Sequence, residues 1–213
     1  MNENILIQTK RSALKIFTIN NKSNTNEVFI SNYKMFKDIV DECVKEIISQ
    51  ELLNENPKIY IYGRECTQHR SIAFFSDESI GYHYSNQLAE SKKITYSLKK
   101  LLDFINNNFA GDDKYNGILV NRYKDGTDYI GAHSDNENGL SKSSGVISVS
   151  YGATRKFRIR DIHTKKIVKD IPTEEYSIMQ MCGDFQKEFT HEVPIEKKIK
   201  EERISFTFRK HSV

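Results

Sequence analysis

The sequence has no tryptophan, only three cysteines and no long apolar run. The cysteines, Cys43, Cys66 and Cys182, are odd in number and far apart, so neither a disulfide framework nor a CxxC zinc site is indicated. No stretch approaches the roughly 18 apolar residues of a membrane span, and the first residues lack the apolar segment of a signal peptide. We therefore expect an intracellular protein with no membrane partner; nucleus and cytoplasm are not distinguished.

An excess of charge of one sign is also missing. The chain has 32 Lys and Arg against 29 Asp and Glu, a net charge of +3, which permits nucleic-acid binding without arguing for it. Apolar residues make up 38% of the 213, enough for one large domain with a polar periphery. We expect residues 1–26 to form a strand or arm whose polar end is mobile, and 27–213 to form a single domain. A monomer with no required protein partner is the default.

Two helices are expected first. Apolar residues from Met35 to Ile48 recur at helical spacing, with Ser31 or Asn32 as the N-cap, and a second helix is expected over 94–109. Short segments rich in Val, Ile, Phe and Tyr follow, as is typical of strands. These are 117–123, 145–151, 155–160, 166–171, 176–181 and 202–209. Helices followed by many short strands predict an α+β domain with a sandwich or barrel of antiparallel sheet.

The last expected strand, RISFTFR, has one polar face. Alternation places four residues on it: Arg203, Ser205, Thr207 and Arg209. An edge strand that shows its polar face to water would have the same pattern. The segment GILVNRY, however, also ends with two polar residues on one face, Asn121 and Tyr123. If both faces turn into a barrel, the two arginines there require a ligand with more than one negative charge.

His133 and Asp135 stand two residues apart in the loop NRYKDGTDYIGAHSDNENG. In an extended segment both point to one side and can bind one ion, although such a pair is more often part of a turn. His191, in FTHEVP, offers a third ligand. Two histidines and a carboxylate leave coordination positions free, as a ferrous oxygenase requires. The other histidines lack comparable context and are taken as ordinary polar or surface residues: His69, His83, His163 and His211.

Along the chain the motifs follow the order Asn121 and Tyr123, His133 and Asp135, His191, then the polar face from Arg203 to Arg209. In this order they resemble the AlkB family of iron(II)- and 2-oxoglutarate-dependent dioxygenases, and most of all its branch that repairs alkylated nucleic-acid bases. The resemblance includes NRYKDG to HSDNE, ISVSYGATRKFRIR, FTHEVP and RISFTFRK, and upstream QHRSIAFFSDESIGYHYS, so it covers roughly residues 58–211. It implies a double-stranded β-helix, or jelly roll, over about 115–211 with N-terminal helices. It also implies a nucleotide-recognition lid over about 58–90.

The resemblance implies that Fe(II) is held by His133, Asp135 and His191. The pocket for 2-oxoglutarate would consist of Asn121, Tyr123, Arg203, Ser205, Thr207 and Arg209, with Arg203 on the distal carboxylate. Ser205 departs from the Asn that is frequent in the family, so an altered cofactor affinity is expected at most. The implied reaction consumes O2 and converts 2-oxoglutarate to succinate, with ascorbate as reductant in vitro. It removes N-methyl groups from bases of the 1-methyladenine or 3-methylcytosine type, in DNA or RNA, as formaldehyde.

The resemblance also suggests residues on the substrate side. They are Tyr62 in a wedge hairpin, Arg70 on phosphate, Tyr82 and Tyr84 in the lid, and Asn136 and Glu137 beside the base. The wedge segment has an alternative interpretation, in which Tyr60 and Tyr62 are simply the solvent face of a strand. Asn136 replaces a frequent Asp, which predicts a relaxed or shifted base preference. The basic run KKIKEER is either a phosphate-contacting loop or a solvated turn.

Three alternatives stay open. The chain could be an iron and 2-oxoglutarate oxygenase for a protein or small-molecule substrate, since the iron and cofactor motifs do not fix the substrate. A non-enzymatic nucleic-acid-binding module would lack a metal ligand or a cofactor arginine, and neither is missing. A hydrolytic zinc enzyme would have no need of Arg203 and Arg209. The sequence does not decide between DNA and RNA, between single and double strands, or between lesions.

Overall fold

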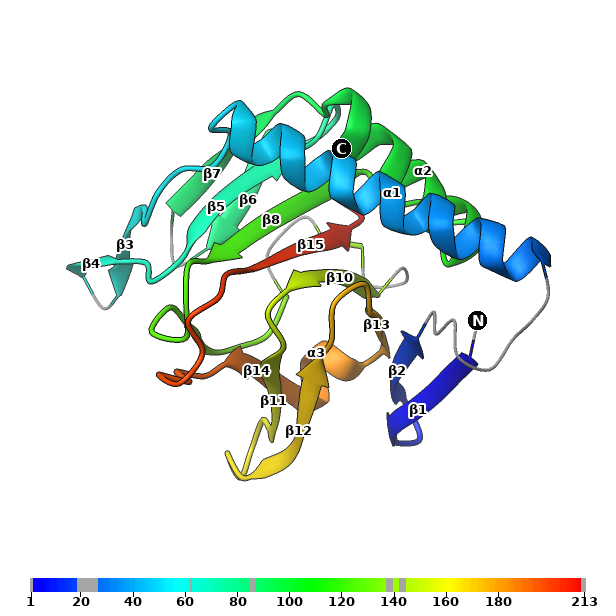
Figure 1. Cartoon of the computed structure of the whole chain (residues 1–213). Coiled ribbons are helices and arrows are strands. Elements are labelled where there is room, and N and C mark those ends of the chain that lie inside the picture. The colour runs from blue at the N-terminus through cyan, green and yellow to red at the C-terminus, as the bar shows by residue number, and fades with distance from the viewer. Residues whose placement is uncertain are drawn as a thin grey trace.

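The computed structural model describes residues 2–18, 27–61, 63–84, 87–136, 140–141 and 145–211. In this part of the chain a larger sheet packs against a smaller one, and two helices cover the outer face of the larger sheet (Figure 1). The helices are α1 (Glu27–Ser49), α2 (Tyr96–Asn108) and the short α3 (Phe185–Glu188). The strands are β1 (Asn2–Gln8), β2 (Ser12–Thr18), β3 (Lys58–Ile61), β4 (Arg64–Thr67), β5 (Ser71–Phe75), β6 (Gly81–Tyr84), β7 (Gln87–Lys92), β8 (Gly117–Tyr123), β9 (Ile130–His133), β10 (Val146–Gly152), β11 (Arg155–Asp161), β12 (Ile167–Thr173), β13 (Ile178–Gly183), β14 (Phe189–Val193) and β15 (Arg203–Arg209).

The larger sheet has the strand order β1-β2-β13-β10-β15-β8-β5-β7-β6, and the smaller one has the order β12-β11-β14-β9. Strands β3 and β4 form a separate hairpin beside the larger sheet. Among the described strands every neighbouring pair is antiparallel except β5 with β7. This arrangement confirms the predicted α+β sandwich of antiparallel sheet with helices N-terminal to its core.

Helices α1 and α2 form because their apolar residues recur at intervals of three and four. The buried side chains of α2 include Leu98, Leu101 and Ile105, and the Thr95 hydroxyl caps its first turn by accepting a hydrogen bond from the Leu98 N–H. The predicted N-cap of α1 is wrong. The helix begins at Glu27, five residues before Asn32, because no Gly or Pro interrupts the segment and an acidic residue suits its first turn.

Strand β15 lies in the middle of the larger sheet, between β10 and β8, and all seven of its residues are buried. Ile204, Phe206 and Phe208 pack under the helices. Its four polar residues line a pocket between the two sheets: Arg203, Ser205, Thr207 and Arg209. The alternative of a water-facing edge strand is therefore excluded, and the predicted inward polar face is confirmed.

The six strands predicted after the second helix all exist, each with its ends within two residues of the prediction. The prediction missed β9 and β14, which have only four and five residues. At the N-terminus, the described part of the predicted arm is a hairpin, and β2 extends the larger sheet by pairing with β13. Residues 19–26 lie outside the described part. None of the described helices has both the length and the apolar character of a membrane span.

Candidate metal centre and cosubstrate pocket

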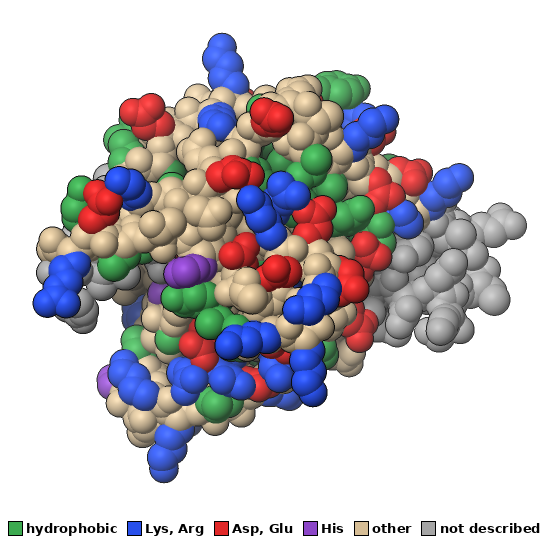
Figure 2. Space-filling model, turned by 60° about the vertical axis from the view of Figure 1, so that its left-hand side comes forward, with side chains coloured by type: hydrophobic (Ala, Val, Ile, Leu, Met, Phe, Trp, Pro, Cys, Tyr) green, Lys and Arg blue, Asp and Glu red, His purple; other side chains and the backbone are tan. Residues whose placement is uncertain are grey.

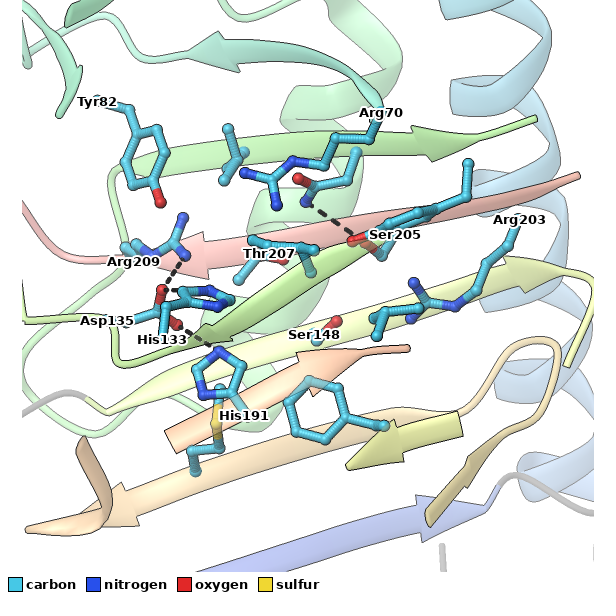
Figure 3. Close-up of a pocket in the computed structure, with 17 residues that line it drawn as sticks. Arg70, Tyr82, His133, Asp135, Ser148, His191, Arg203, Ser205, Thr207 and Arg209 are labelled. Atoms are coloured by element: carbon cyan, nitrogen blue, oxygen red, sulfur yellow. Dashed lines mark hydrogen bonds and ion pairs between the residues drawn. The ribbon is translucent and has the colours of Figure 1, made fainter. Parts of the chain in front are cut away.

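The three predicted metal ligands come together at the end of β9 and the middle of β14. His133 pairs directly with His191 across these two strands, and Asp135 follows two residues after β9. The possible ligand atoms of the three side chains all lie within 4.8 Å of one another. Nε2 of His191 is 3.6 Å from Oδ2 of Asp135, and Nε2 of His133 is 3.9 Å from Oδ1 (Figure 3). The three groups therefore face one point, as a single metal ion requires.

The surroundings of the ligands fit a metal ion. Nδ1 of His133 is 2.9 Å from the carbonyl oxygen of Gly131, an arrangement that fixes the ring and leaves Nε2 as the ligand atom. The His191 ring stacks on Phe157 with centroids 5.0 Å apart. Oδ2 of Asp135 is buried and makes no hydrogen bond within the described residues. A buried carboxylate oxygen without a partner is costly, and a bound cation would satisfy it.

The charges of the three groups also suit Fe(II). Burial lowers the pKa of His133 to about 3, and the neighbouring His191 acts in the same direction. Burial likewise lowers the pKa of His191, so both rings are neutral at neutral pH, the form that binds metal. Burial alone would raise the pKa of Asp135, but the Arg209 cation and the histidines outweigh it and keep that pKa below its ordinary value. Two neutral imidazoles and one carboxylate are the donor set of a ferrous oxygenase.

Arg209 connects the metal centre to the rest of the pocket. Its Nη2 lies 2.5 Å from Oδ1 of Asp135, and both side chains are almost fully buried. The same guanidinium lies over the ring of Tyr82, 4.8 Å from its centroid. Arg209 thus holds one carboxylate oxygen, while Oδ2 stays on the side of His191.

Arg203 lies at the opposite end of the same pocket (Figure 3). It donates hydrogen bonds to the hydroxyls of Ser150, at 3.0 Å, and Thr173, at 3.1 Å, and its guanidinium lies 5.6 Å from the ring centroid of Tyr123. Burial lowers the pKa of Arg203 to about 10, and the positive charge of Arg155 adds to this effect. Arg203 is therefore still a cation at neutral pH. No carboxylate among the described residues forms an ion pair with it.

The register of β8 and β15 explains why the predicted cosubstrate residues share one pocket. Arg203 pairs with Tyr123 and Ser205 with Asn121, so the polar positions of both strands face the same side. The amide of Asn121 donates a hydrogen bond of 3.4 Å to the Ser205 hydroxyl. The structure brings the six residues predicted to bind the cosubstrate into one pocket. Its lining includes Asn121, Tyr123, Arg203, Ser205, Thr207 and Arg209.

The pocket carries a net positive charge. Its described lining residues include three arginines, Arg70, Arg203 and Arg209, and one acidic residue, Asp135, which gives 3 − 1 = +2 with neutral histidines. A pocket with this charge inside a protein favours a dianionic ligand, because a bound dianion repays the cost of burying the cations. The inference from the sequence, that the polar faces surround a ligand with more than one negative charge, agrees with this geometry.

The predicted substrate residues divide into three groups. Arg70 and Tyr82 are buried and line the metal pocket, so Arg70 does not lie at the surface where the predicted phosphate contact would form. Asn136 is exposed and lines an adjoining cavity with Asp135 and Gln186. The other predicted residues cannot be placed: Tyr62 and Glu137 lie outside the described residues, as does the side chain of Tyr84.

The surface predictions concern the lid hairpin and the basic run. Ile59 is 5% exposed and Tyr60 is 44% exposed, so this part of β3 alternates between the interior and solvent, as the simpler interpretation of the segment predicts. The basic run is described and its lysines, Lys197, Lys198 and Lys200, are exposed. Lys and Arg side chains gather on the lower part of the face in Figure 2, with acidic side chains between them. A contact of this run with phosphate stays a prediction.

Sequence reasoning missed Arg155, a buried residue that joins the loops on either side of the pocket. Its guanidinium donates to the carbonyl oxygens of Asp125 (2.9 Å), Asp128 (2.8 Å) and Pro194 (2.8 Å). The loop of Asp125 and Asp128 leads into β9, and Pro194 follows β14. Arg155 therefore fixes both strands that carry the histidines. The signal was present in RKFRIR, since Arg155 shares the apolar face of β11 with Phe157.

Gly126 in the same loop lies where a side chain would clash with the neighbouring backbone, so any substitution should lower stability. A Cβ there would lie 1.9 Å from the carbonyl oxygen of Glu196, and the backbone of Gly126 is hydrogen-bonded to both Ile199 and Glu196. We expect Gly126→Ala to lower the free energy of unfolding by about 1–3 kcal/mol through overpacking. The measurement is denaturant unfolding beside Gly111→Ala, whose Cβ would meet nothing within 4 Å. Equal stability of the two variants would contradict this reading of the loop.

The family follows from comparison with known proteins. Residues 33–209 match the family described as the 2OG-Fe(II) oxygenase superfamily. The chain belongs to this superfamily. Human DNA oxidative demethylase ALKBH2 is 29% identical over 180 residues, which cover 81% of this chain and 67% of the human protein. Bovine ALKBH2 is 28% identical over 181 residues, covering 81% of this chain and 63% of its own length. The chain thus spans about two thirds of these relatives.

Two further comparisons agree. The rat alpha-ketoglutarate-dependent dioxygenase alkB homolog 3 is 35% identical over 104 residues, 45% of this chain and 35% of the rat protein. The solved structure of OsALKBH1 superposes with a TM-score of 0.52 at 16% identity and covers 95% of this chain and 100% of that one. The jelly-roll fold is confirmed. The chain is an AlkB-family dioxygenase that uses Fe(II) and 2-oxoglutarate, and the His133, Asp135 and His191 triad fits that metal.

Proposed function

We propose that this chain oxidatively removes methyl groups from N-alkylated bases of DNA or RNA. The observation that carries the proposal is one continuous pocket with the metal triad at one end and the buried cation of Arg203 at the other. Arg70 and Tyr82, from the segment that resembles a nucleotide-recognition lid, line the wall of this pocket. The relatives named as DNA oxidative demethylases align with 81% of the chain, so the likeness extends well beyond the metal ligands.

The described residues supply binding and positioning. His133, Asp135 and His191 would hold Fe(II), and Fe(II) with 2-oxoglutarate and O2 would supply the oxidant. The Arg203 guanidinium, which also donates to Ser150 and Thr173, would bind the distal carboxylate of 2-oxoglutarate through its remaining N–H groups, with the Tyr123 ring beside it. The reaction balances because 2-oxoglutarate loses CO2, one oxygen atom of O2 enters the resulting succinate and the other enters the methyl group. The C–N bond of the resulting hydroxymethyl group then breaks, formaldehyde leaves and the base nitrogen is restored.

A panel of oligonucleotides tests the proposal. Each carries one 1-methyladenine or 3-methylcytosine, in single-stranded DNA, double-stranded DNA or single-stranded RNA, and is incubated with protein, Fe(II), 2-oxoglutarate and ascorbate. Mass spectrometry should detect methyl loss that requires iron and disappears in His133→Ala, and the ranking of the strands identifies the polymer. Succinate formation without methyl loss on any strand would instead favour an oxygenase for a protein or small-molecule substrate.

Ser205→Asn tests the departure from the family pattern. Ser205 contributes one hydroxyl to the pocket, through its 3.4 Å contact with the Asn121 amide, and makes no ion pair. Exchanging one neutral hydrogen-bonding group for another changes binding by about 0.5–1.5 kcal/mol, so the KM for 2-oxoglutarate should change by less than about tenfold. Steady-state succinate formation measures it. An increase in this KM of about 100-fold or more, the effect of losing a charged contact to the cosubstrate, would mean that Ser205 does more than shape the pocket.

Asn136→Asp tests the base preference. Asn136 is exposed next to Asp135 and keeps a hydrogen-bond acceptor without the charge of a carboxylate. A negative charge at this position should strengthen selection for cationic bases such as 1-methyladenine, since opposite charges attract at short range. We expect a higher kcat/KM of Asn136→Asp on 1-methyladenine than of the wild type. Equal rates for the two proteins would remove the hypothesis of relaxed preference.

A further inference from the structure

A second cavity opens beside the metal pocket. It has a volume of about 460 Å³ and lies between the segment from β4 to β5 and the edge of β9. Arg70 and Ile130 line both cavities, so the two are adjacent. None of the described residues that line the second cavity is acidic. On the face in Figure 2, histidine and hydrophobic side chains border a hollow between the upper and the lower part of the molecule.

A pair of stacked rings forms one wall of this second cavity. The imidazole of His69 and the ring of Tyr129 have centroids 4.7 Å apart and planes inclined by 21°. The Tyr129 N–H donates a hydrogen bond of 2.9 Å to the carbonyl oxygen of His69, so the two residues are also joined through the backbone. His69 is exposed, whereas Tyr129 is half-buried beneath it. The pair therefore presents an aromatic face to solvent on a fixed support.

The floor of the cavity leads to the metal ligands. It includes Gly131 and Ala132, which are exposed on β9, the edge strand of the smaller sheet. A Cβ built on Gly131 would meet nothing within 4 Å, so the space above this strand is open. His133 is the next residue of the same strand. A ligand in this cavity therefore lies directly beside a group held at the metal.

We propose that this cavity binds the nucleotide next to the target base, with its base stacked on His69. The inference rests on the proposed function and specifies how the substrate strand is held. An aromatic face stacks with any base, and such stacking is worth about 1–3 kcal/mol per base without sequence preference. The absence of acidic side chains from the described lining suits a phosphodiester backbone. The enzyme then recognises a lesion within a strand better than a free methylated nucleotide.

The test compares trinucleotides that carry a central 1-methyladenine with the same trinucleotides made abasic at one flank. Binding is measured by fluorescence anisotropy with protein loaded with Fe(II) and 2-oxoglutarate under nitrogen, so that no turnover occurs. His69→Ala should weaken binding of the full trinucleotide by about 5- to 150-fold. It should leave binding of methylated mononucleotide and the KM for 2-oxoglutarate unchanged. His69→Phe should restore affinity, and His163→Ala, an exposed histidine on the β11–β12 turn, is the matched control.

The outcomes separate this inference from the proposed function. The stacking site is supported if His69→Ala weakens binding of the full trinucleotide, if this loss disappears for one of the two flank-abasic trinucleotides, and if His69→Phe restores the affinity. This support stands even if no strand loses its methyl group. In that case only the demethylase proposal fails. Equal binding by wild type and His69→Ala overturns the stacking site while demethylation stands. Equal loss of trinucleotide and mononucleotide binding would also overturn it, because it would indicate a structural role for His69. A wild type that binds no oligonucleotide would refute both.

Discussion

Asp135→Asn is expected to abolish turnover and to destabilise the protein at the same time. The amide removes the only acidic side chain among the described residues that line the metal pocket. It also leaves the Arg209 cation, which now lies 2.5 Å from Oδ1 of Asp135, buried without its partner. Succinate formation should fall by more than about 100-fold, the upper range for losing a group that merely supports a ligand. The free energy of unfolding of the metal-free protein should fall by about 3–5 kcal/mol, the cost of breaking a buried ion pair.

Two further variants separate these effects. In Asp135→Asn/Arg209→Met both charges are gone, so stability should recover while iron binding and turnover do not. Asp170→Asn removes a carboxylate from a partly exposed pair with Arg158 and should cost at most about 1 kcal/mol. Chemical denaturation and iron titration measure the two quantities. An Asp135→Asn protein with wild-type turnover would contradict the metal site, and one with wild-type stability would contradict the buried pair.

Arg203→Gln should raise the KM for 2-oxoglutarate by about 100-fold or more. A bidentate guanidinium makes two charge-assisted hydrogen bonds to a carboxylate, each worth about 1.5–3 kcal/mol. The metal-free protein should lose little stability, because burial lowers the pKa of Arg203 to about 10 and the folded state thus disfavours the charge that the variant removes. The large effect should therefore appear in the KM for 2-oxoglutarate and not in the free energy of unfolding. Substitution of an arginine with a purely structural role would show the opposite pattern.

The controls for Arg203 use a lysine and a surface arginine. Arg203→Lys keeps the charge but not the planar fork, so it should recover only part of the affinity. Arg160→Gln, on the outer face of the smaller sheet beside Glu192, should leave the KM unchanged. Thermal melting with and without 2-oxoglutarate adds a binding readout, since a ligand stabilises only the protein that binds it. If Arg203→Gln were stabilised by 2-oxoglutarate as much as the wild type, the cosubstrate would sit elsewhere.

Much of the pocket could be predicted because β15 and β8 carry their polar residues at every second position. Alternation alone put Arg203 and Ser205 on one face, and the pairing of β15 with β8 set them opposite Tyr123 and Asn121. Strands β9 and β14 could not be predicted with the same ease, because four or five residues give too little periodicity. In FTHEV, the position of His191 between the inward Phe189 and Val193 was the available signal.

The remaining differences arise from contacts between distant segments. Nothing in QHRS indicates that Arg70 turns inward toward the metal ligands, whereas the structure buries it to 2% exposure. The same holds for His69, which the sequence presents as an ordinary histidine. Its stacking partner, Tyr129, is brought beside it by the fold across a separation of 129 − 69 = 60 residues. Which residues surround the substrate therefore depends on tertiary packing that periodicity does not encode.

The most direct test of the account counts two products in one reaction. Wild-type protein, Fe(II), 2-oxoglutarate, O2 and a singly methylated oligonucleotide are mixed, and mass spectrometry follows methyl groups lost and succinate formed over time. One succinate should form for each methyl group lost, and both products should be absent in Asp135→Asn. Methyl loss that proceeds without succinate, or that persists in Asp135→Asn, would contradict the claim that this pocket joins iron, 2-oxoglutarate and a methylated base in one reaction.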